Sequence, residues 1–211
     1  MPQDYKDFDR LDFASNYRSG NPIIRFLLNR FYRKLESLIR SRLGSLTAVL
    51  EVGSGEGYST SFIGRLLREH NVMFFSSDLI TELISRNKKR TGETNLFVQD
   101  IMKLAVGAKK VDLVIALEVL EHLSDPGMAV SELARVTKRW ALVSVPFEPW
   151  WRLGNIFRGA YLRDLGNTPD HVNHWGKGGF ARLLRSDFSR VKVSVSFPWL
   201  VALCEHPLAR N

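Results

Sequence analysis

Carboxylates and glycines gather at the ends of short apolar segments in the first half of the sequence. Residues 47–52 form an apolar segment that is followed directly by the turn Gly53-Ser-Gly55-Glu-Gly57. Glycine tolerates positive φ and lets a ligand approach the backbone, which a Cβ atom would obstruct. Glu51 precedes the first glycine, and the next two apolar segments end at Asp78 and Asp100. This pattern predicts a ligand site where a glycine turn meets carboxylates.

The residues around this turn argue against a dinucleotide and for a nucleoside. The dinucleotide fingerprint G-x-G-x-x-G would require glycine at position 58, which is Tyr58. Glu51 would repel the phosphates of a dinucleotide. Asp78 and Asp100 instead suit the hydroxyl groups of a neutral ribose and the amino group of adenine. In open parallel sheets, ligands bind at the carboxyl ends of the strands, where these acids are expected.

The segments that carry these residues alternate between strand and helix patterns. Strands are predicted over 47–52, 72–76, 95–98, 111–116, 140–145, 191–197 and 199–204, and helices over 24–39, 60–70, 81–90 and 125–136. Strands alternating with helices imply right-handed βαβ units and a doubly wound parallel sheet. Only Pro198 separates the last two strands, so they should form an antiparallel pair at the sheet's edge.

The predicted fold class is therefore α/β. We expect a Rossmann-like, seven-stranded, mostly parallel sheet with one antiparallel edge strand and helices on both faces. Such a sheet brings the ends of neighbouring parallel strands to one edge of the molecule, which is where the carboxylates would meet.

Composition places the chain among ordinary globular proteins. Its 211 residues, 45% apolar and 25% charged, suffice for one domain with a substantial core. No apolar run reaches the roughly 18 residues of a membrane span. Cys204 is the only cysteine, which excludes a disulfide framework and fits a reducing, cytoplasmic location. The net charge of +8 is dispersed along the chain and does not decide between general solubility and an anionic partner.

Taken in order, these motifs resemble those of the class I S-adenosylmethionine-dependent methyltransferases. The resemblance is to the type 11 group and, more distantly, to ubiquinone-pathway O-methyltransferases. It covers residues 46–147 and rests on the glycine turn, Asp78, the segment 98–101 (VQDI) and the segment 112–123 (DLVIALEVLEHL). The resemblance implies that the chain binds S-adenosylmethionine and releases S-adenosylhomocysteine.

The resemblance also assigns cofactor contacts. Asp78 is expected to accept hydrogen bonds from the ribose hydroxyls, and Asp100 to receive the adenine amino group. Leu79 and Ile101 would enclose the adenine ring, while Glu51 orients the ammonium group of the methionine part. The glycines contact that part through their backbone, and the residues that end strand 111–116 face the methyl group. The complete implied set is Glu51, Gly53, Ser54, Gly55, Gly57, Asp78, Leu79, Asp100, Ile101, Leu117 and Glu118.

Three histidines are the candidate catalytic residues. Methyl transfer from a sulfonium is an in-line displacement, and a base is needed only when the acceptor must lose a proton. We consider His122, His171 and His174 as that base or as substrate contacts. Some methyltransferases that resemble this chain hold a divalent metal with a set like Glu118-x-x-Glu121-His122. Metal-free use of these residues is the preferred interpretation, so no metal ligand is assigned.

Two segments are expected to control access to the site. Residues 146–178 form an insertion rich in aromatic side chains, interpreted as a substrate lid or, alternatively, as a packed subdomain. Residues 1–45 contain a lead-in and an amphipathic basic helix, and residues 46–211 form the methyltransferase domain. The helix either covers the cofactor, with Arg25 at the methionine carboxylate, or lies on an anionic membrane, or simply docks on the domain.

The sequence therefore predicts methyl transfer to an oxygen or nitrogen of a small-molecule or lipid-linked acceptor. An RNA methyltransferase is the first alternative, and it is not favoured because the basic residues are dispersed and the chain has no room for an appended RNA-binding module. A non-catalytic protein that binds S-adenosylmethionine is the second, and the intact Glu51, Asp78 and Asp100 speak against it. Peripheral membrane contact and the oligomeric state are left open.

Overall fold

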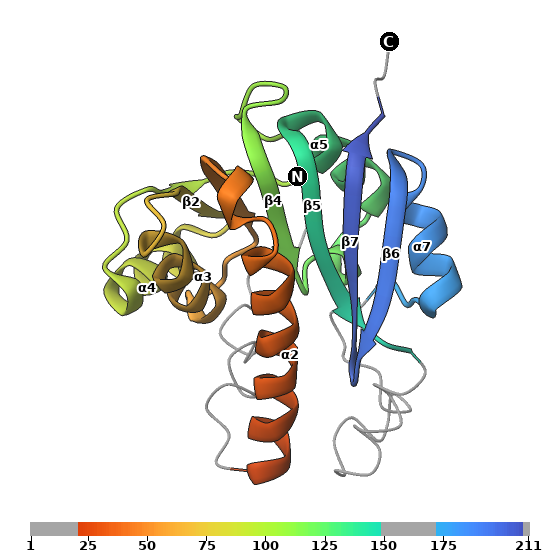
Figure 1. The fold of residues 1–211 in the computed structure, drawn as a ribbon, viewed down its shortest axis with the longest axis horizontal. Coiled ribbons are helices and arrows are strands. Elements are labelled where there is room, and N and C mark those ends of the chain that lie inside the picture. The colour runs from red at the N-terminus through yellow and green to blue at the C-terminus, as the bar shows by residue number, and fades with distance from the viewer. Residues whose placement is uncertain (1–20, 149–171, 209–211) are drawn as a thin grey trace.

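A seven-stranded sheet forms the centre of the protein, seen in a computed structural model that describes residues 21–148 and 172–208. The strand order is β3-β2-β1-β4-β5-β7-β6 (Figure 1). The bounds are β1 Ala48–Val52, β2 Met73–Asp78, β3 Leu96–Val98, β4 Val111–Leu117, β5 Thr137–Pro146, β6 Phe188–Ser196 and β7 Trp199–Pro207. The predicted α/β class and all of the predicted strands are confirmed.

Strand directions follow the expected mixture. The pairs β3·β2, β2·β1, β1·β4 and β4·β5 are parallel, whereas β7 runs antiparallel to both β5 and β6. The turn from Ser196 to Trp199 is too short for a crossover helix, so β6 and β7 form the predicted antiparallel pair at the sheet's edge. The reversed strand of that pair, β7, lies one place inside the edge strand β6.

Helices cover both faces of the sheet. Their bounds are α2 Pro22–Arg40, α3 Tyr58–Arg68, α4 Thr81–Thr91, α5 Pro126–Val136 and α7 Lys177–Leu184, with short 3₁₀ turns at η2 Leu43–Ser45 and η3 Leu120–His122. One core cluster joins α5 and α7 to the sheet, and a second joins α2 and α3 to the opposite face. The doubly wound arrangement is therefore present, and both faces of the central strands are buried.

Successive side chains of the central strands point alternately into these two core clusters. In β4, Leu113 and Ile115 belong to the cluster under α2 and α3, while Val114 and Ala116 belong to the cluster under α5 and α7. Because neither face reaches water, every residue of the strand except the last is buried. This explains why the segment reads as an almost continuous apolar run rather than an alternating one.

Two helices begin at a side-chain cap. The Asn21 side chain accepts a hydrogen bond from the Ile23 amide at 2.9 Å, with Pro22 in the first turn of α2. The Asp125 side chain likewise accepts one from the Met128 amide at 2.9 Å at the start of α5. These short polar side chains satisfy amides that lack a partner within the helix.

Helix α7 was missed by the sequence analysis. Its sequence, KGGFARLL, opens with a glycine pair that lowers helix propensity. The helix is stabilised instead by tertiary packing, because Phe180 and Leu184 are fully buried one turn apart in the core cluster on that face.

We expect Phe31→Ala to lower the free energy of unfolding by about 3–5 kcal/mol. Phe31 is 1% exposed and its ring lies 4.8 Å from that of Trp199, so truncation leaves a cavity between α2 and β7. Phe26 on the same helix is 59% exposed, and Phe26→Ala serves as the matched control with an expected change below about 0.5 kcal/mol. Urea denaturation measures both variants. Equal, small effects would show that α2 is not docked on the domain.

Candidate functional site

The glycine turn is tied to the end of β2. The amides of Gly53 and Ser54 donate to the Ser77 carbonyl at 2.8 and 3.0 Å. The Gly55 amide donates to Asp78 Oδ2 at 2.8 Å, and the other carboxylate oxygen of Asp78 accepts from the Ile80 amide at 3.1 Å. The turn after β1 is therefore hydrogen-bonded to the acid that ends β2. This is expected, because both lie at the carboxyl ends of neighbouring parallel strands.

The three glycines of the turn have different reasons for lacking a side chain. A Cβ atom on Gly53 would lie 2.3 Å from Val119 Cγ2, and one on Gly57 would lie 2.4 Å from Asn87 Oδ1. Packing against protein atoms thus requires glycine at these positions. Gly55 has a φ of 54°, yet its Cβ direction meets nothing within 4 Å. Gly55 is the position where a ligand can lie against the backbone.

A buried polar network supports the turn from beneath. Glu51 Oε2 accepts hydrogen bonds from Thr60 Oγ1 at 2.6 Å and Ser76 Oγ at 2.9 Å. Asn87 Nδ2 donates to Ser54 Oγ at 3.0 Å and to Thr60 Oγ1 at 2.9 Å. Burial raises the pKa of Glu51, and the hydroxyl hydrogen bonds oppose that rise. Glu51 therefore holds the turn in place, while its contact with a ligand's ammonium group stays a prediction.

Asp78 and Leu79 present a polar and an apolar surface side by side. Asp78 is 8% exposed; burial raises its pKa, and amide hydrogen bonds from Gly55, Ile80 and Leu79 counteract this. The neighbouring Leu79 side chain is 44% exposed despite its apolar character. A carboxylate beside an exposed apolar side chain suits a nucleoside, whose sugar needs hydrogen bonds and whose base needs an apolar contact.

Asp100, the third predicted acid, lies on a segment that its neighbour Gln99 attaches to the end of β2. Asp100 is half-buried, and its Oδ1 accepts a hydrogen bond from the Met102 amide at 2.8 Å. The buried Gln99 donates to Ser77 Oγ at 2.8 Å and joins this segment to the end of β2. Ile101 is 6% exposed and belongs to the core cluster under α5, so it is less accessible to a ligand than Leu79.

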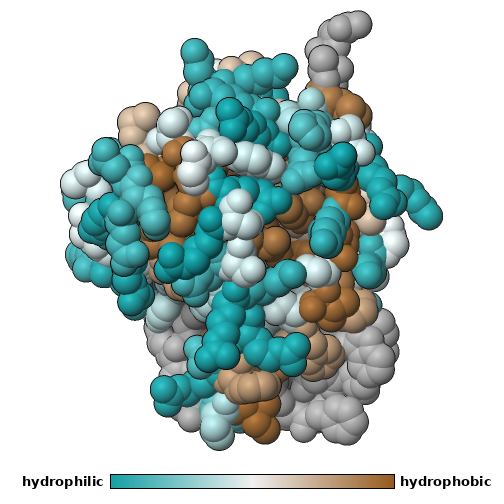
Figure 2. Space-filling model, in the orientation of Figure 1, coloured by the Kyte–Doolittle hydropathy of each residue, from teal (hydrophilic) through white to brown (hydrophobic). Residues whose placement is uncertain are grey.

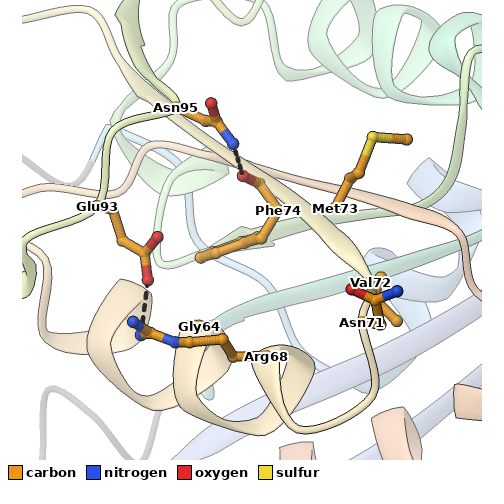
Figure 3. Close-up of a pocket in the computed structure, with 8 residues that line it drawn as sticks. All are labelled: Gly64, Arg68, Asn71, Val72, Met73, Phe74, Glu93 and Asn95. Atoms are coloured by element: carbon orange, nitrogen blue, oxygen red, sulfur yellow. Dashed lines mark hydrogen bonds and ion pairs between the residues drawn. The ribbon is translucent and has the colours of Figure 1, made fainter.

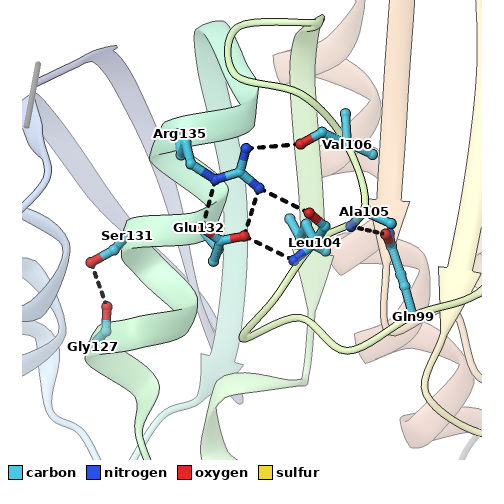
Figure 4. A network of polar contacts seen from close by, with 8 residues as sticks. All are labelled: Gln99, Leu104, Ala105, Val106, Gly127, Ser131, Glu132 and Arg135. Carbon is cyan, nitrogen blue, oxygen red and sulfur yellow. Dashed lines mark hydrogen bonds and ion pairs between the residues drawn. The ribbon is translucent and has the colours of Figure 1, made fainter.

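A salt bridge on α5 holds the chain that follows Asp100 (Figure 4). Arg135 pairs with Glu132 at 2.6 Å and donates to the carbonyls of Leu104 and Val106 at 2.9 and 2.8 Å. Glu132 accepts from the Leu104 amide at 2.8 Å, and the hydrogen bond from Arg135 lowers the pKa of Glu132. The sequence analysis missed this pair, because its i, i+3 spacing on a helix is also that of ordinary surface charges.

Glu118 has an unusual backbone conformation and a raised pKa. It follows β4 with a φ of 57°, a conformation that costs a non-glycine residue energy and is concentrated at functional sites. Its Oε1 accepts a hydrogen bond from Ser144 Oγ at 2.9 Å, and the Trp199 side chain also hydrogen-bonds to it. Burial, and secondly the charge of Glu121, raise the pKa of Glu118 well above its usual value. Leu117, the last residue of β4, is half-buried beside it.

The described histidines of the predicted catalytic set lie at this same edge. His122 is half-buried in η3, four residues after Glu118. His174 Nδ1 lies 3.5 Å from Oε1 of Glu148, a carboxylate that is 8% exposed and follows β5. The chain before His174 is held against η3, because the amides of residues 172 and 173 donate to the Glu121 carbonyl at 3.0 and 3.1 Å. His171, and most of the insertion 146–178, lie outside the described residues.

Glu148 was not among the predicted site residues. The sequence signal that could have found it is the motif Pro146-Phe-Glu148, in which an acid directly follows a buried strand.

Metal ligation has no support in the described parts of the chain. Among residues 21–148 and 172–208, no group of three or more His, Cys, Asp or Glu side chains is arranged to hold a metal ion. Glu118, Glu121 and His122 lie close in sequence, but the geometry of these side chains does not form such a group.

A surface hollow elsewhere is not part of this site (Figure 3). It measures about 260 Å³ and is lined by Gly64, Arg68, Asn71, Val72, Met73, Phe74, Glu93 and Asn95. Residues from the beginning of β2 form its wall, so it lies at the opposite end of that strand from Asp78. Three of its polar side chains have partners, with Arg68 bound to Glu93 at 2.9 Å and Asn95 to the Phe74 carbonyl at 3.1 Å.

Known proteins share both the motifs and the fold. Residues 50–144 match the family model described as a methyltransferase domain. Two probable S-adenosylmethionine-dependent methyltransferases of Mycobacterium tuberculosis are each 27% identical over 119 residues, which is 56% of this chain. The match covers 42% of each relative, so the chain spans less than half of their length.

Solved structures agree at the level of the fold. Magnesium protoporphyrin IX methyltransferase from Synechocystis PCC 6803, with bound S-adenosylhomocysteine, superposes with a TM-score of 0.66 at 17% identity, covering 95% of this chain and 94% of that one. The CurJ carbon methyltransferase superposes with a TM-score of 0.70 at 15% identity, covering 91% of this chain and 57% of the other. Methyltransferases with different acceptors therefore share this architecture.

We expect Asp78→Asn to weaken S-adenosylmethionine binding by about 1–3 kcal/mol, because an amide nitrogen in place of Oδ1 or Oδ2 no longer accepts a hydrogen bond. Isothermal titration calorimetry measures the affinity. Asp112→Asn is the matched control: Asp112 accepts hydrogen bonds from Thr47 and Ala48 at the opposite end of the sheet. Its substitution should lower stability and leave the affinity unchanged. Equal affinities for Asp78→Asn and the unmodified protein would remove Asp78 from the site.

We expect Glu118→Gln to raise the free energy of unfolding at neutral pH. Because the pKa of Glu118 is raised in the folded protein, the stability that it contributes when protonated is lost as the pH rises from its usual value of 4.5 through the folded value. Glutamine cannot ionise, so the advantage of the variant should vanish in acid. Urea denaturation across pH tests this, with the exposed Glu69→Gln as a control. A variant less stable than the parent at neutral pH would contradict the expectation.

Proposed function

We propose that this chain, which carries a class I S-adenosylmethionine-dependent methyltransferase domain, methylates an oxygen or a nitrogen of a small-molecule or lipid-linked acceptor. The residues present suit the cofactor. Open space beside Gly55, the carboxylate of Asp78 and the exposed Leu79 side chain form a cradle for a nucleoside and an amino-acid tail. When bound, the cofactor supplies a methyl group that is already activated for displacement.

The observation that carries the choice of acceptor is the set of proton-accepting groups after β4 and β5. Glu118 and Glu121 lie after β4, and Glu148 with His174 lies beside the end of β5. A hydroxyl or an amine binds to such groups by donating its own hydrogen. An acceptor that gives up this proton as the methyl group arrives is an oxygen or a nitrogen nucleophile.

His174 is the best placed candidate for the base. The carboxylate of Glu148 lies 3.5 Å from Nδ1 and favours the tautomer in which that nitrogen carries the hydrogen, so Nε2 is the atom that takes a proton. Glu148 acts through His174 and is a positioning residue. Glu118 would then hold the acceptor by a hydrogen bond, and the buried strand ends would exclude water from the reacting atoms.

The experiment must distinguish an oxygen or nitrogen acceptor from a carbon acceptor, because carbon methyltransferases share this fold. The protein is incubated with S-adenosylmethionine carrying a ¹³C-labelled methyl group and with a small-molecule and lipid extract. The chemical shift of the transferred methyl carbon then distinguishes O-, N- and C-methyl products. A methoxy or N-methyl resonance supports the proposal, whereas a C-methyl product or label in RNA contradicts it. Cofactor binding without transfer of the methyl group would favour the non-catalytic alternative, and absence of cofactor binding would refute the proposed function.

The predicted cytoplasmic location also remains a proposal. Within residues 21–148 and 172–208, no helix combines the length and apolarity needed to cross a bilayer. Cys204 is a buried, unpaired thiol whose pKa is raised by burial, which suits a reducing compartment.

With the acceptor identified, we expect His174→Ala to lower kcat about 100-fold or more, since the general base is lost. Glu148→Gln should lower kcat less, because the imidazole remains but is no longer oriented. The dissociation constant for S-adenosylmethionine should not change in either variant. The exposed His70, on the loop before β2, provides the control His70→Ala with unchanged kcat. A His174→Ala enzyme with parental kcat would exclude His174 as the base.

A further inference from the structure

The first turns of α2 extend beyond the ends of the strands. In Figure 1 this helix extends well past the strand ends, with its amino terminus farthest from the sheet. The first buried side chain of the helix is Leu28. Ahead of it, Ile23 is 67% exposed and Phe26 is 59% exposed. Two large apolar side chains at a projecting tip are costly to leave in water and indicate a contact surface.

The exposed face of α2 is also cationic. Arg25, Arg30 and Arg33 are exposed, and the only acid of the helix, Glu36, is engaged by Arg40 at 2.8 Å. Positions 26, 30 and 33 follow one another at helical spacing, so the basic and apolar side chains share a face. Figure 2 shows hydrophilic side chains along this helix and a hydrophobic spot at its tip.

The opposite face of α2 fastens this tip to the candidate active site. The ring of Phe31 packs at 4.8 Å from the ring of Trp199, and the Trp199 side chain hydrogen-bonds to Glu118. The helix therefore holds its tip at a set position relative to the carboxyl ends of the strands. Whatever the tip contacts is brought to the side of the molecule where the acceptor is expected.

We propose that this tip of α2 docks on an anionic lipid bilayer, with Ile23 and Phe26 entering the interface and Arg25, Arg30 and Arg33 contacting lipid phosphates. Apolar insertion combined with cationic attraction is how an interfacial helix binds to a membrane. A single-stranded RNA would engage the arginines but would leave Ile23 without a role, since bases stack on aromatic rings.

Docking in this way would place the strand ends next to the bilayer. The acceptor would then be lipid-linked rather than freely soluble, a consequence that rests on the proposed function. The docking itself does not depend on methyl transfer.

Co-sedimentation with phosphatidylcholine vesicles that contain phosphatidylglycerol tests the proposal directly. We expect binding to these vesicles, weakening as salt is added, and little binding to pure phosphatidylcholine. The double substitution Ile23→Ser with Phe26→Ser should weaken binding about tenfold or more, because the apolar insertion is lost. Arg30→Gln with Arg33→Gln should weaken binding roughly tenfold through lost attraction to the lipid phosphates.

Matched substitutions elsewhere separate docking from general effects. Lys88→Gln with Lys89→Gln removes the same charge from the exposed face of α4, and Met128→Ser removes an exposed apolar side chain, 51% accessible, from α5. Both controls should bind vesicles like the parent protein. Calorimetry with S-adenosylmethionine on every variant should give the parental affinity.

Three results would overturn the proposal: no vesicle binding, equal binding to neutral and anionic vesicles, or parental binding by both α2 variants. RNA that binds this face while vesicles do not would assign the surface to nucleic acid instead. A failure of cofactor binding in the parent protein would refute the proposed function and leave the membrane result standing.

Discussion

The hydrogen bond from the Gly55 amide to the Asp78 carboxylate is the contact on which the site's geometry depends. It joins the turn after β1 to the end of β2, and the Ser77 carbonyl reinforces it by accepting the amides of Gly53 and Ser54. Burying a carboxylate is unfavourable, but backbone amides aimed at it offset much of the cost. A turn held in this way keeps the backbone at Gly55 open without help from a ligand, which is the preorganisation that tight binding requires.

Much of the fold, and the position of the acids at one edge of the sheet, could be predicted, because both follow from local patterns. Strand and helix periodicities identify the elements, and βαβ handedness then sends the ends of parallel strands to one edge. Asp78 ends β2 and Asp100 follows the neighbouring strand β3, so both lie at the same edge of the sheet although 22 positions separate them in sequence. The helix caps at Asn21 and Asp125 are local too, because each accepts a hydrogen bond from an amide two or three residues further on.

The parts that escaped prediction are contacts between distant elements. Asn87 looks like an unremarkable polar residue on α4, and only the packing of α4 against α3 shows that it donates to Ser54 and Thr60. The pairing of Glu148 with His174 likewise depends on how the chain returns to the sheet at residue 172. Helix α7 formed against its glycine-rich sequence because burial of Phe180 outweighs propensity. Sequence patterns within a single helix or strand do not reveal such contacts, because the partner residue lies in a distant part of the sequence.

The chain as a whole is basic, whereas the candidate site is rich in carboxylates. The chain carries a net charge of +8, yet Glu51, Asp78, Glu121 and Glu148 are all buried at the edge that should bind the ligands. Their burial destabilises the folded protein, so the arrangement is better explained by function than by stability. A pocket of carboxylates suits a cofactor that carries a sulfonium and an ammonium. A sulfonium loses its charge when its methyl group leaves, so these carboxylates would bind such a product less favourably than the substrate, which would favour turnover.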